Sequence, residues 1–491
     1  MSDRDDVSAA GGGVGPPADQ PATGAAWPVH GYGHGAAGPD DSAWDADDRE
    51  RTGDDGSGEP DNAGDGVPDG AGGVVRRRRW RAAAVVVVVV VLAAAGVLLW
   101  QAHRPDPPFP PPAASSPTPT LPTTIGQLLR SRREALLRGD EAGWLRDVDP
   151  AKPALLAQLR TRYQTLLALQ VSGWYETVLD PDGEVRLPTA IVVRVKVAYC
   201  LARPGCELDG IASVVEQVGF TSRDGRVWLT DLLPTQVDRD QQVPVPWQTG
   251  PLQAATGGRV IVAAPPELAG RLDDTLAHAE QAARVADRYA RFLNAPDHYL
   301  VYLAGPAQWH QWFGTRPSGP DPLAYAIHIS RLDMQIVVDA GHVGPDRIQL
   351  VLQHELGHVV TLTDAKPRVD LFNEDAWLAE GIAEYIAWAD RSPTTYYRLD
   401  DVRRHLRAGW NGQIRQLVPQ YDTPAASAVY GISYLALRYL ADHYGEAAML
   451  AFVNAVLRQN LTIEGTAQYR FGKLWTTLNT ECATYIRTIA R

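Results

Sequence analysis

The pattern of hydrophobic and polar positions changes several times along the chain, and each stretch predicts a different structure. Residues 1–75 contain almost no aliphatic clusters and are rich in Gly, Asp, Ala and Pro. Such a segment cannot bury enough apolar surface to offset its chain entropy. We therefore predict that residues 1–75 form a disordered tail.

Residues 82–100 carry no charge and include an unbroken run of valines at 85–91. A helix of about 20 apolar residues spans the ~30 Å hydrocarbon core of a bilayer. Five arginines lie within residues 76–81, just before this stretch, so the positive-inside rule predicts a cytoplasmic tail and extracytoplasmic C-terminal domains. Residues 76–101 are thus predicted to be a single-pass anchor in the cell membrane, with a cleaved signal peptide as the alternative.

Residues 102–124 are rich in proline and predict a stiff linker. Leucines then recur at helical spacing up to Leu169, and from Trp174 onward apolar and polar residues alternate as in strands. Helices followed by an antiparallel sheet predict a small α+β domain over residues 125–245. Through Leu137-Arg138-Gly139-Asp140, Trp144-Leu145 and the late strands, this domain resembles the cone-shaped nuclear-transport-factor-like fold. No acid–base constellation stands out in it, which favours a scaffold or binding role.

Residues 250–491 predict a second domain, because short apolar runs give way to helical periodicity. Four runs begin at Val260, Tyr299, Ala324 and Ile336, with one long helix between the first two. Beyond Arg347 the pattern is helical almost to the end of the chain. The predicted fold class is α+β. The predicted order is a disordered tail, a transmembrane helix, a cone-like α+β domain, and a domain with a small mixed sheet and a helical lobe.

Charge and cysteine content narrow the possible functions. The formal net charge is −12, of which the first 75 residues contribute −13, so the rest of the chain is nearly neutral. A nucleic-acid partner is not expected, because such proteins present a basic face. Arg outnumbers Lys by 42 to 4, which indicates the coding bias of a high-GC bacterium. Cys200 and Cys206 flank a turn and predict a local disulfide, whereas Cys482 is predicted to be a buried free thiol.

His354-Glu355-Leu356-Gly357-His358 is an HExxH sequence inside an apolar helical segment. On a helix, residues i and i+4 share a face, so His354 and His358 can bind the same metal ion. Glu355 is offset by one residue and can take a proton from a water molecule at the open side of the ion. The pattern predicts a zinc site with Glu355 as general base.

A third ligand is expected downstream, in Trp377-Leu378-Ala379-Glu380-Gly381-Ile382-Ala383-Glu384-Tyr385. An HExxH with Glu380 of this sequence 22 residues after His358 resembles the gluzincin metallopeptidases, the thermolysin- and aminopeptidase-like clan. The resemblance implies zinc held by His354, His358 and Glu380. It also places at Glu384 a carboxylate that orients a ligand histidine, the alternative being an acid on the helix surface.

The same family uses a Tyr or His to stabilise the oxyanion. Tyr430-Gly431-Ile432-Ser433-Tyr434-Leu435 resembles the helix that carries this tyrosine in aminopeptidase-like members, and Tyr430 is our candidate. The alternative is that the tyrosines pack in a helical core, which is favoured for Tyr434 and Tyr439.

Two departures from the aminopeptidase pattern bear on activity. Ala379 replaces the usual Asn, and the Gly-x-Met-Glu-Asn segment that binds a free amine is absent, since Met334 is followed by Gln335. We therefore predict a membrane-anchored zinc peptidase that acts outside the cytoplasm on peptides or proteins, as an endopeptidase rather than an aminopeptidase. The alternative is an envelope-associated binding or scaffold protein with an inactive peptidase-like domain. Nothing in the sequence indicates an oligomeric state.

Overall fold

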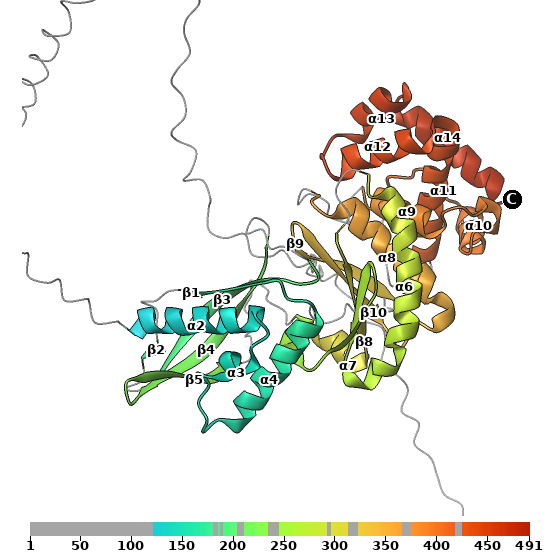
Figure 1. Ribbon diagram of the computed structural model, residues 1–491. Helices are drawn as coiled ribbons and strands as arrows, with labels where there is room; N and C mark the ends of the chain where they lie inside the picture. Colours follow the sequence, from blue (N-terminus) through green and yellow to red (C-terminus); the bar gives the residue numbers. More distant parts are fainter. Residues whose placement is uncertain are drawn as a thin grey trace, which may run out of the picture. The chain divides into compact units, whose positions relative to one another are not determined.

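The computed structural model describes residues 121–179, 185–186, 190–203, 211–233, 245–291, 296–312, 323–365, 375–417 and 425–491 (Figure 1). The predicted tail at 1–75, the predicted anchor at 76–101 and most of the predicted linker at 102–124 lie outside these ranges.

The predicted transmembrane helix, and with it the single-pass location in the cell membrane, is corrected. Within the described ranges, no helix is both long enough and apolar enough to cross a bilayer. The longest helices there contain charged residues, for example Glu355 in the 18-residue helix and Arg438 and Asp442 in the 19-residue helix.

The N-terminal part of the described chain consists of three helices and an antiparallel sheet, so its α+β character is confirmed. The helices are α2 (Leu121–Leu137), α3 (Glu141–Leu145) and α4 (Pro153–Ala168). The strands are β1 (Gly173–Leu179), β2 (Val185–Arg186), β3 (Ala190–Cys200), β4 (Ala212–Arg223) and β5 (Arg226–Leu233). Their order is β1-β3-β4-β5, with β2 also paired to β3, and all of these pairings are antiparallel.

The interior of this α+β part contains charged side chains that the sequence did not indicate. Arg162 of α4 and Glu216 of β4 form an ion pair at 3.0 Å, and their side chains are only 7% and 6% exposed. Arg132 of α2 is also buried, with its guanidinium 4.1 Å from the ring centre of Trp144. Burial raises the pKa of the Glu176 carboxyl on β1. Buried charges persist where they are paired, so this interior is more polar than an ordinary core.

Of the three cysteines, Cys200 is disulfide-bonded and Cys482 is a buried free thiol. The second of these findings confirms the prediction for Cys482. Cys206, the partner that the spacing predicts for Cys200, lies outside the described residues.

The C-terminal part begins with a mixed sheet. After α5 (Pro246–Thr249), the strands are β6 (Gln253–Thr256), β7 (Val260–Ala264), β8 (Tyr299–Ala304), β9 (Ala324–Ser330) and β10 (Asp333–Asp339). The order β6-β7-β8-β10-β9 has parallel pairings in the centre and antiparallel pairings at both edges. The first long helix, α6 (Leu272–Ala286), is flanked by the 3₁₀ turns η1 (Pro266–Arg271) and η2 (Asp287–Tyr289), and α7 (Pro306–Gln311) follows β8.

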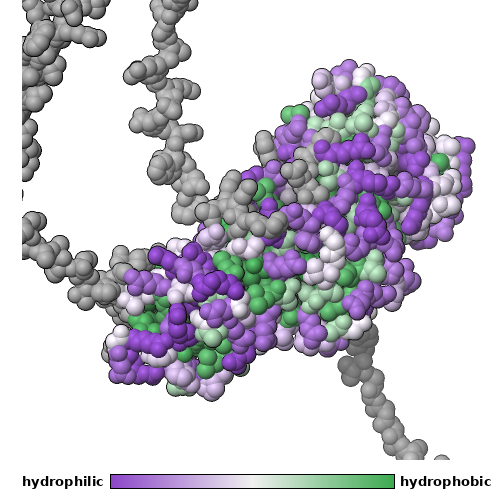
Figure 2. Space-filling model, viewed as in Figure 1, coloured by the Kyte–Doolittle hydropathy of each residue, from purple (hydrophilic) through white to green (hydrophobic). Residues whose placement is uncertain are grey.

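From Pro345 onward the described chain is helical, as the periodicity predicts. The elements are α8 (Pro345–Leu362), α9 (Ala376–Ala387), η3 (Pro393–Thr395), α10 (Leu399–Arg407), α11 (Ala426–Tyr444), α12 (Glu446–Leu457), α13 (Ile463–Phe471) and α14 (Trp475–Ile489). Figure 2 shows a mainly hydrophilic surface over these last helices, so their apolar residues are directed inward.

Strand alternation divides the core into two hydrophobic clusters. Val260, Val262 and Val301 lie in the cluster built with α6, α8 and the later helices. Ile261 and Leu300, on the opposite face of the same strands, lie in the cluster that contains the α+β core. Because successive strand residues point to opposite faces, the buried strands β7 and β8 contribute to both clusters.

Candidate metal centre

The HExxH segment lies in the second half of α8. Gly344 and Pro345 begin this helix, and proline is well suited to the first helical position because its missing N–H needs no partner there. The i, i+4 spacing then directs His354 and His358 to the same side, where α9 packs against α8. His358 is 7% exposed, so its imidazole lies in the protein interior.

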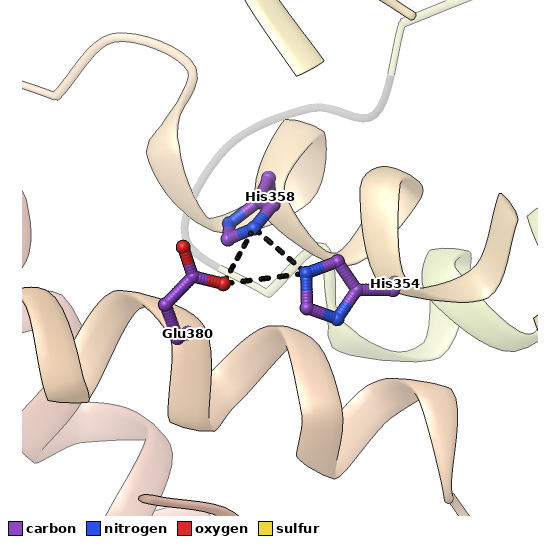
Figure 3. Close-up of side chains that lie close together, drawn as sticks. All are labelled: His354, His358 and Glu380. Atoms are coloured by element: carbon purple, nitrogen blue, oxygen red, sulfur yellow. Dashed lines mark hydrogen bonds and ion pairs between the residues drawn. The ribbon is translucent and has the colours of Figure 1, made fainter. Parts of the chain in front are cut away.

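Glu380 of α9 points between the two histidines, as Figure 3 shows. The two Nε2 atoms of His354 and His358 are 3.1 Å apart. Oε2 of Glu380 lies 3.3 Å from His354 Nε2 and 3.4 Å from His358 Nε2. The three predicted ligands, drawn from two helices, therefore converge on one point, and they are a His-His-Glu group that could hold a metal ion.

This donor set fits zinc. Ligand atoms about 2.0–2.2 Å from a tetrahedral zinc ion lie about 3.3 Å from one another, which is close to the three separations here. The charges around the three residues also favour a bound cation. Burial alone lowers the pKa of His354, but hydrogen bonds to Glu380 and Glu384 outweigh it and raise that pKa to about 10. The pocket between the carboxylates thus favours a positive charge.

Glu384 lies one helical turn beyond Glu380 and is completely buried, which excludes the alternative of a surface acid. Its Oε1 lies 3.3 Å from Nδ1 of His354, the ring nitrogen on the far side from Glu380. Burial raises the pKa of Glu384, but the charge of Arg398 and the contact with His354 outweigh burial and lower it to about 2. An ionised carboxylate at this position can accept a hydrogen bond from Nδ1 of His354.

Glu355 is 7% exposed and lies beside the His-His-Glu group. Burial raises the pKa of its carboxyl, although the charges of His354 and His358 act in the opposite direction. The backbone N–H of Ala326 in β9 donates to this carboxylate. Since β9 is the outermost strand on its side of the described sheet, Glu355 lies where that edge approaches α8.

Tyr430 is the half-buried member of the three tyrosines considered from the sequence. Its ring centre lies 5.8 Å from that of His354. Tyr434 is 1% exposed and stacks on Tyr396 with the ring centres 4.3 Å apart, and Tyr439 donates a hydrogen bond to Glu481. The last two belong to the helical core, whereas the ring of Tyr430 lies next to that of His354.

Two glycines allow α8, α9 and α11 to approach closely enough to form the site. A Cβ at Gly357 would lie 3.1 Å from the Cα of Ala383, and a Cβ at Gly381 would lie 2.9 Å from the backbone oxygen of Ser433. Neither obstacle is a flexible side-chain end, so any larger residue at these positions would push the helices apart.

The sequence did not reveal that Tyr396, Tyr397 and Arg398 contact Glu384. Both tyrosine hydroxyls donate to its carboxylate, and so does Nε of Arg398 at 3.3 Å. The residues lie 12 to 14 positions downstream, between η3 and α10, in a segment without helical periodicity. A consecutive Tyr-Tyr-Arg in a polar stretch was the only available signal, and it does not by itself indicate a partner.

Comparisons with known proteins find distant structural similarity only. No family model matches the chain, and no curated protein does. Among solved structures, it is similar to an M1 zinc metallopeptidase from Deinococcus radiodurans, with 18% identity, a TM-score of 0.31, and 62% of each chain covered. It is also similar to leukotriene A4 hydrolase from yeast, with 16% identity, a TM-score of 0.32, and 53% of this chain and 42% of that chain covered.

The match thus spans less than two thirds of the length of either solved protein.

Proposed function

We propose that the protein is a zinc-dependent peptidase that hydrolyses peptide bonds with a water molecule as nucleophile. The convergence of His354, His358 and Glu380 within about one zinc coordination sphere carries this proposal. A zinc ion held by these three residues would acidify a water molecule and polarise the scissile carbonyl.

Glu355 is the general base in this proposal. Its carboxylate takes a proton from the attacking water and then delivers it to the leaving amine. The raised pKa of its buried carboxyl supports this role, because a carboxylate whose pKa is closer to neutrality takes the proton of the water more readily. Glu384 keeps Nδ1 of His354 occupied, so that Nε2 is directed to the metal.

The proposed substrate is an extended peptide, cleaved internally. Edge strands bind extended peptides through main-chain hydrogen bonds, and β9 ends the described sheet next to Glu355. The missing Gly-x-Met-Glu-Asn segment removes the group that would bind a free amine in aminopeptidases. An internal cleavage site is therefore favoured over removal of N-terminal residues.

Metal analysis and peptide cleavage by the full-length protein test this function. We expect about one zinc ion per chain, cleavage of peptides with either free or acetylated N-termini, loss of activity with a chelator, and recovery with zinc. Cleavage confined to free N-termini would refute the endopeptidase proposal alone. A protein without zinc and without cleavage would instead support the binding or scaffold alternative.

Tyr430 is proposed to donate a hydrogen bond to the oxyanion. Tyr430→Phe is then expected to lower kcat by about 10²–10³-fold, because one oxyanion donor is lost, while zinc content is unchanged. Steady-state kinetics on metal-saturated protein measure the effect. Tyr439→Phe is the matched control, because its hydroxyl bonds Glu481 in the core. Full activity of Tyr430→Phe would remove this residue from the mechanism.

A further inference from the structure

Glu384 is the centre of a hydrogen-bond cluster that extends well beyond the metal ligands. Tyr397 donates to its two carboxylate oxygens at 2.9 and 3.0 Å. Nε of Arg398 lies 3.3 Å from Oε1, the same oxygen that contacts Nδ1 of His354. Because Glu384 is 0% exposed, its charge is balanced here by protein groups rather than by bulk water.

Arg398 also contacts the proposed oxyanion residue. Its guanidinium carbon lies 4.8 Å from the ring centre of Tyr430 and 4.8 Å from that of Tyr397. Its NH1 group donates to Oγ of Ser427 at 3.0 Å. Ser427 and Tyr430 are i and i+3 in the first turns of α11, so Arg398 fixes the beginning of the helix that presents Tyr430.

We propose that Arg398 is a positioning residue that couples the two halves of the peptidase site. Through Glu384 it holds His354 in the orientation that metal binding requires. Through Tyr430 and Ser427 it holds the proposed oxyanion donor beside His354. This inference rests on the proposed peptidase function, and it assigns to Arg398 a role that neither motif indicates.

The chain offers a variant that separates the two contacts. Tyr396→Phe removes a hydroxyl that donates to Glu384 but leaves the contacts of Arg398 with Tyr397, Tyr430 and Ser427 in place, so only the metal-ligand half should be affected. Arg398→Gln removes the contacts that Arg398 makes with Glu384 and with Tyr430. Arg398→Lys keeps the charge but loses the planar group that stacks on Tyr430 and reaches Ser427 at the same time.

Zinc affinity of the full-length protein, measured by competition with a chromophoric chelator, is the first readout. We expect Tyr396→Phe and Arg398→Gln each to weaken zinc binding by about 10–100-fold, the range typical when an outer partner of a ligand is lost. The matched control is Arg288→Gln, because Arg288 likewise pairs with a carboxylate, Asp390, and lies over a tyrosine ring, that of Tyr289. It should keep the affinity of the original protein.

The second readout is kcat at saturating zinc, with KM measured separately. Arg398→Gln and Arg398→Lys should lower kcat by more than Tyr396→Phe does, because only the Arg398 variants lose the contact with Tyr430. In the double variant Arg398→Gln/Tyr430→Phe, the fold-loss in kcat should be smaller than the product of the two single losses. The reason is that Arg398 positions the hydroxyl that Tyr430→Phe removes. Thermal unfolding identifies any variant that has lost its fold, and Arg398→Lys then carries the test.

The outcomes separate the two proposals. The coupling role alone would be overturned if the original protein bound zinc and cleaved peptides while Arg398→Lys and Arg398→Gln kept its zinc affinity and its kcat. Strictly multiplicative losses in the double variant would also overturn it. Original protein that binds no zinc would overturn the peptidase function and this inference together.

Discussion

Glu355→Gln is expected to retain about one zinc ion per chain while losing about 10²–10⁴-fold in kcat, the usual contribution of a general acid–base group. The amide has nearly the shape of the carboxylate, so the packing of this 7% exposed side chain should persist. An amide nitrogen cannot take the proton of the attacking water. Metal analysis and steady-state kinetics on the same preparation measure both quantities.

The matched control for this substitution is Glu446→Gln. This substitution also removes one carboxylate charge, but the carboxylate of Glu446 accepts its hydrogen bonds from Arg291 and from Tyr385 on α9. It should leave kcat unchanged. A Glu355→Gln protein that cleaves peptides at the original rate would contradict the proposed mechanism as a whole, whatever its zinc content.

Glu380→Ala is expected to weaken zinc binding by more than the roughly 10–100-fold typical for an outer partner, because a ligand itself is lost. Without the Glu380 carboxylate, only His354 and His358 of the His-His-Glu group can bind the ion. Zinc in enzymes usually has three protein ligands. Chelator competition measures the affinity. The increase in Tm that zinc should give the original protein should also disappear, since that increase depends on binding to the folded state.

Glu384→Gln provides the comparison for this experiment. It removes a charge one turn away on the same helix, and it should reduce zinc affinity less than Glu380→Ala does. If Glu380→Ala bound zinc as tightly as the original protein, Glu380 would not be a ligand. Equal zinc affinities in Glu380→Ala and Glu384→Gln would mean that Glu380 contributes to zinc binding only through its charge.

The sequence indicated the parts of the site that depend on local spacing. Residues i and i+4 on one helix must share a face, so the side-by-side placement of His354 and His358 follows from the chain itself. The α+β character and the helical C-terminal lobe also followed from periodicity. The role of Tyr396, Tyr397 and Arg398 could not be predicted, because it depends on how a segment without periodicity folds back over Glu384.

Buried charges were missed for a related reason. Arg162 lies in a helix of mixed polarity, where an arginine normally projects into solvent. Only the position of Glu216 across the sheet makes it an interior residue. The membrane anchor was inferred from composition and flanking charge alone, and no helix in the described part of the chain meets the requirements of length and apolarity.

The close approach of the helices at Gly357 and Gly381 means that the recognisable signature of this site is longer than its ligands. A sequence that keeps both histidines and Glu380 but carries a larger residue at either glycine would not bring the donors to the same separations. Relatives that share the chemistry should therefore keep His-Glu-x-Gly-His together with Glu-Gly. Sequences with the ligands alone form a separate group, in which these helices must pack differently.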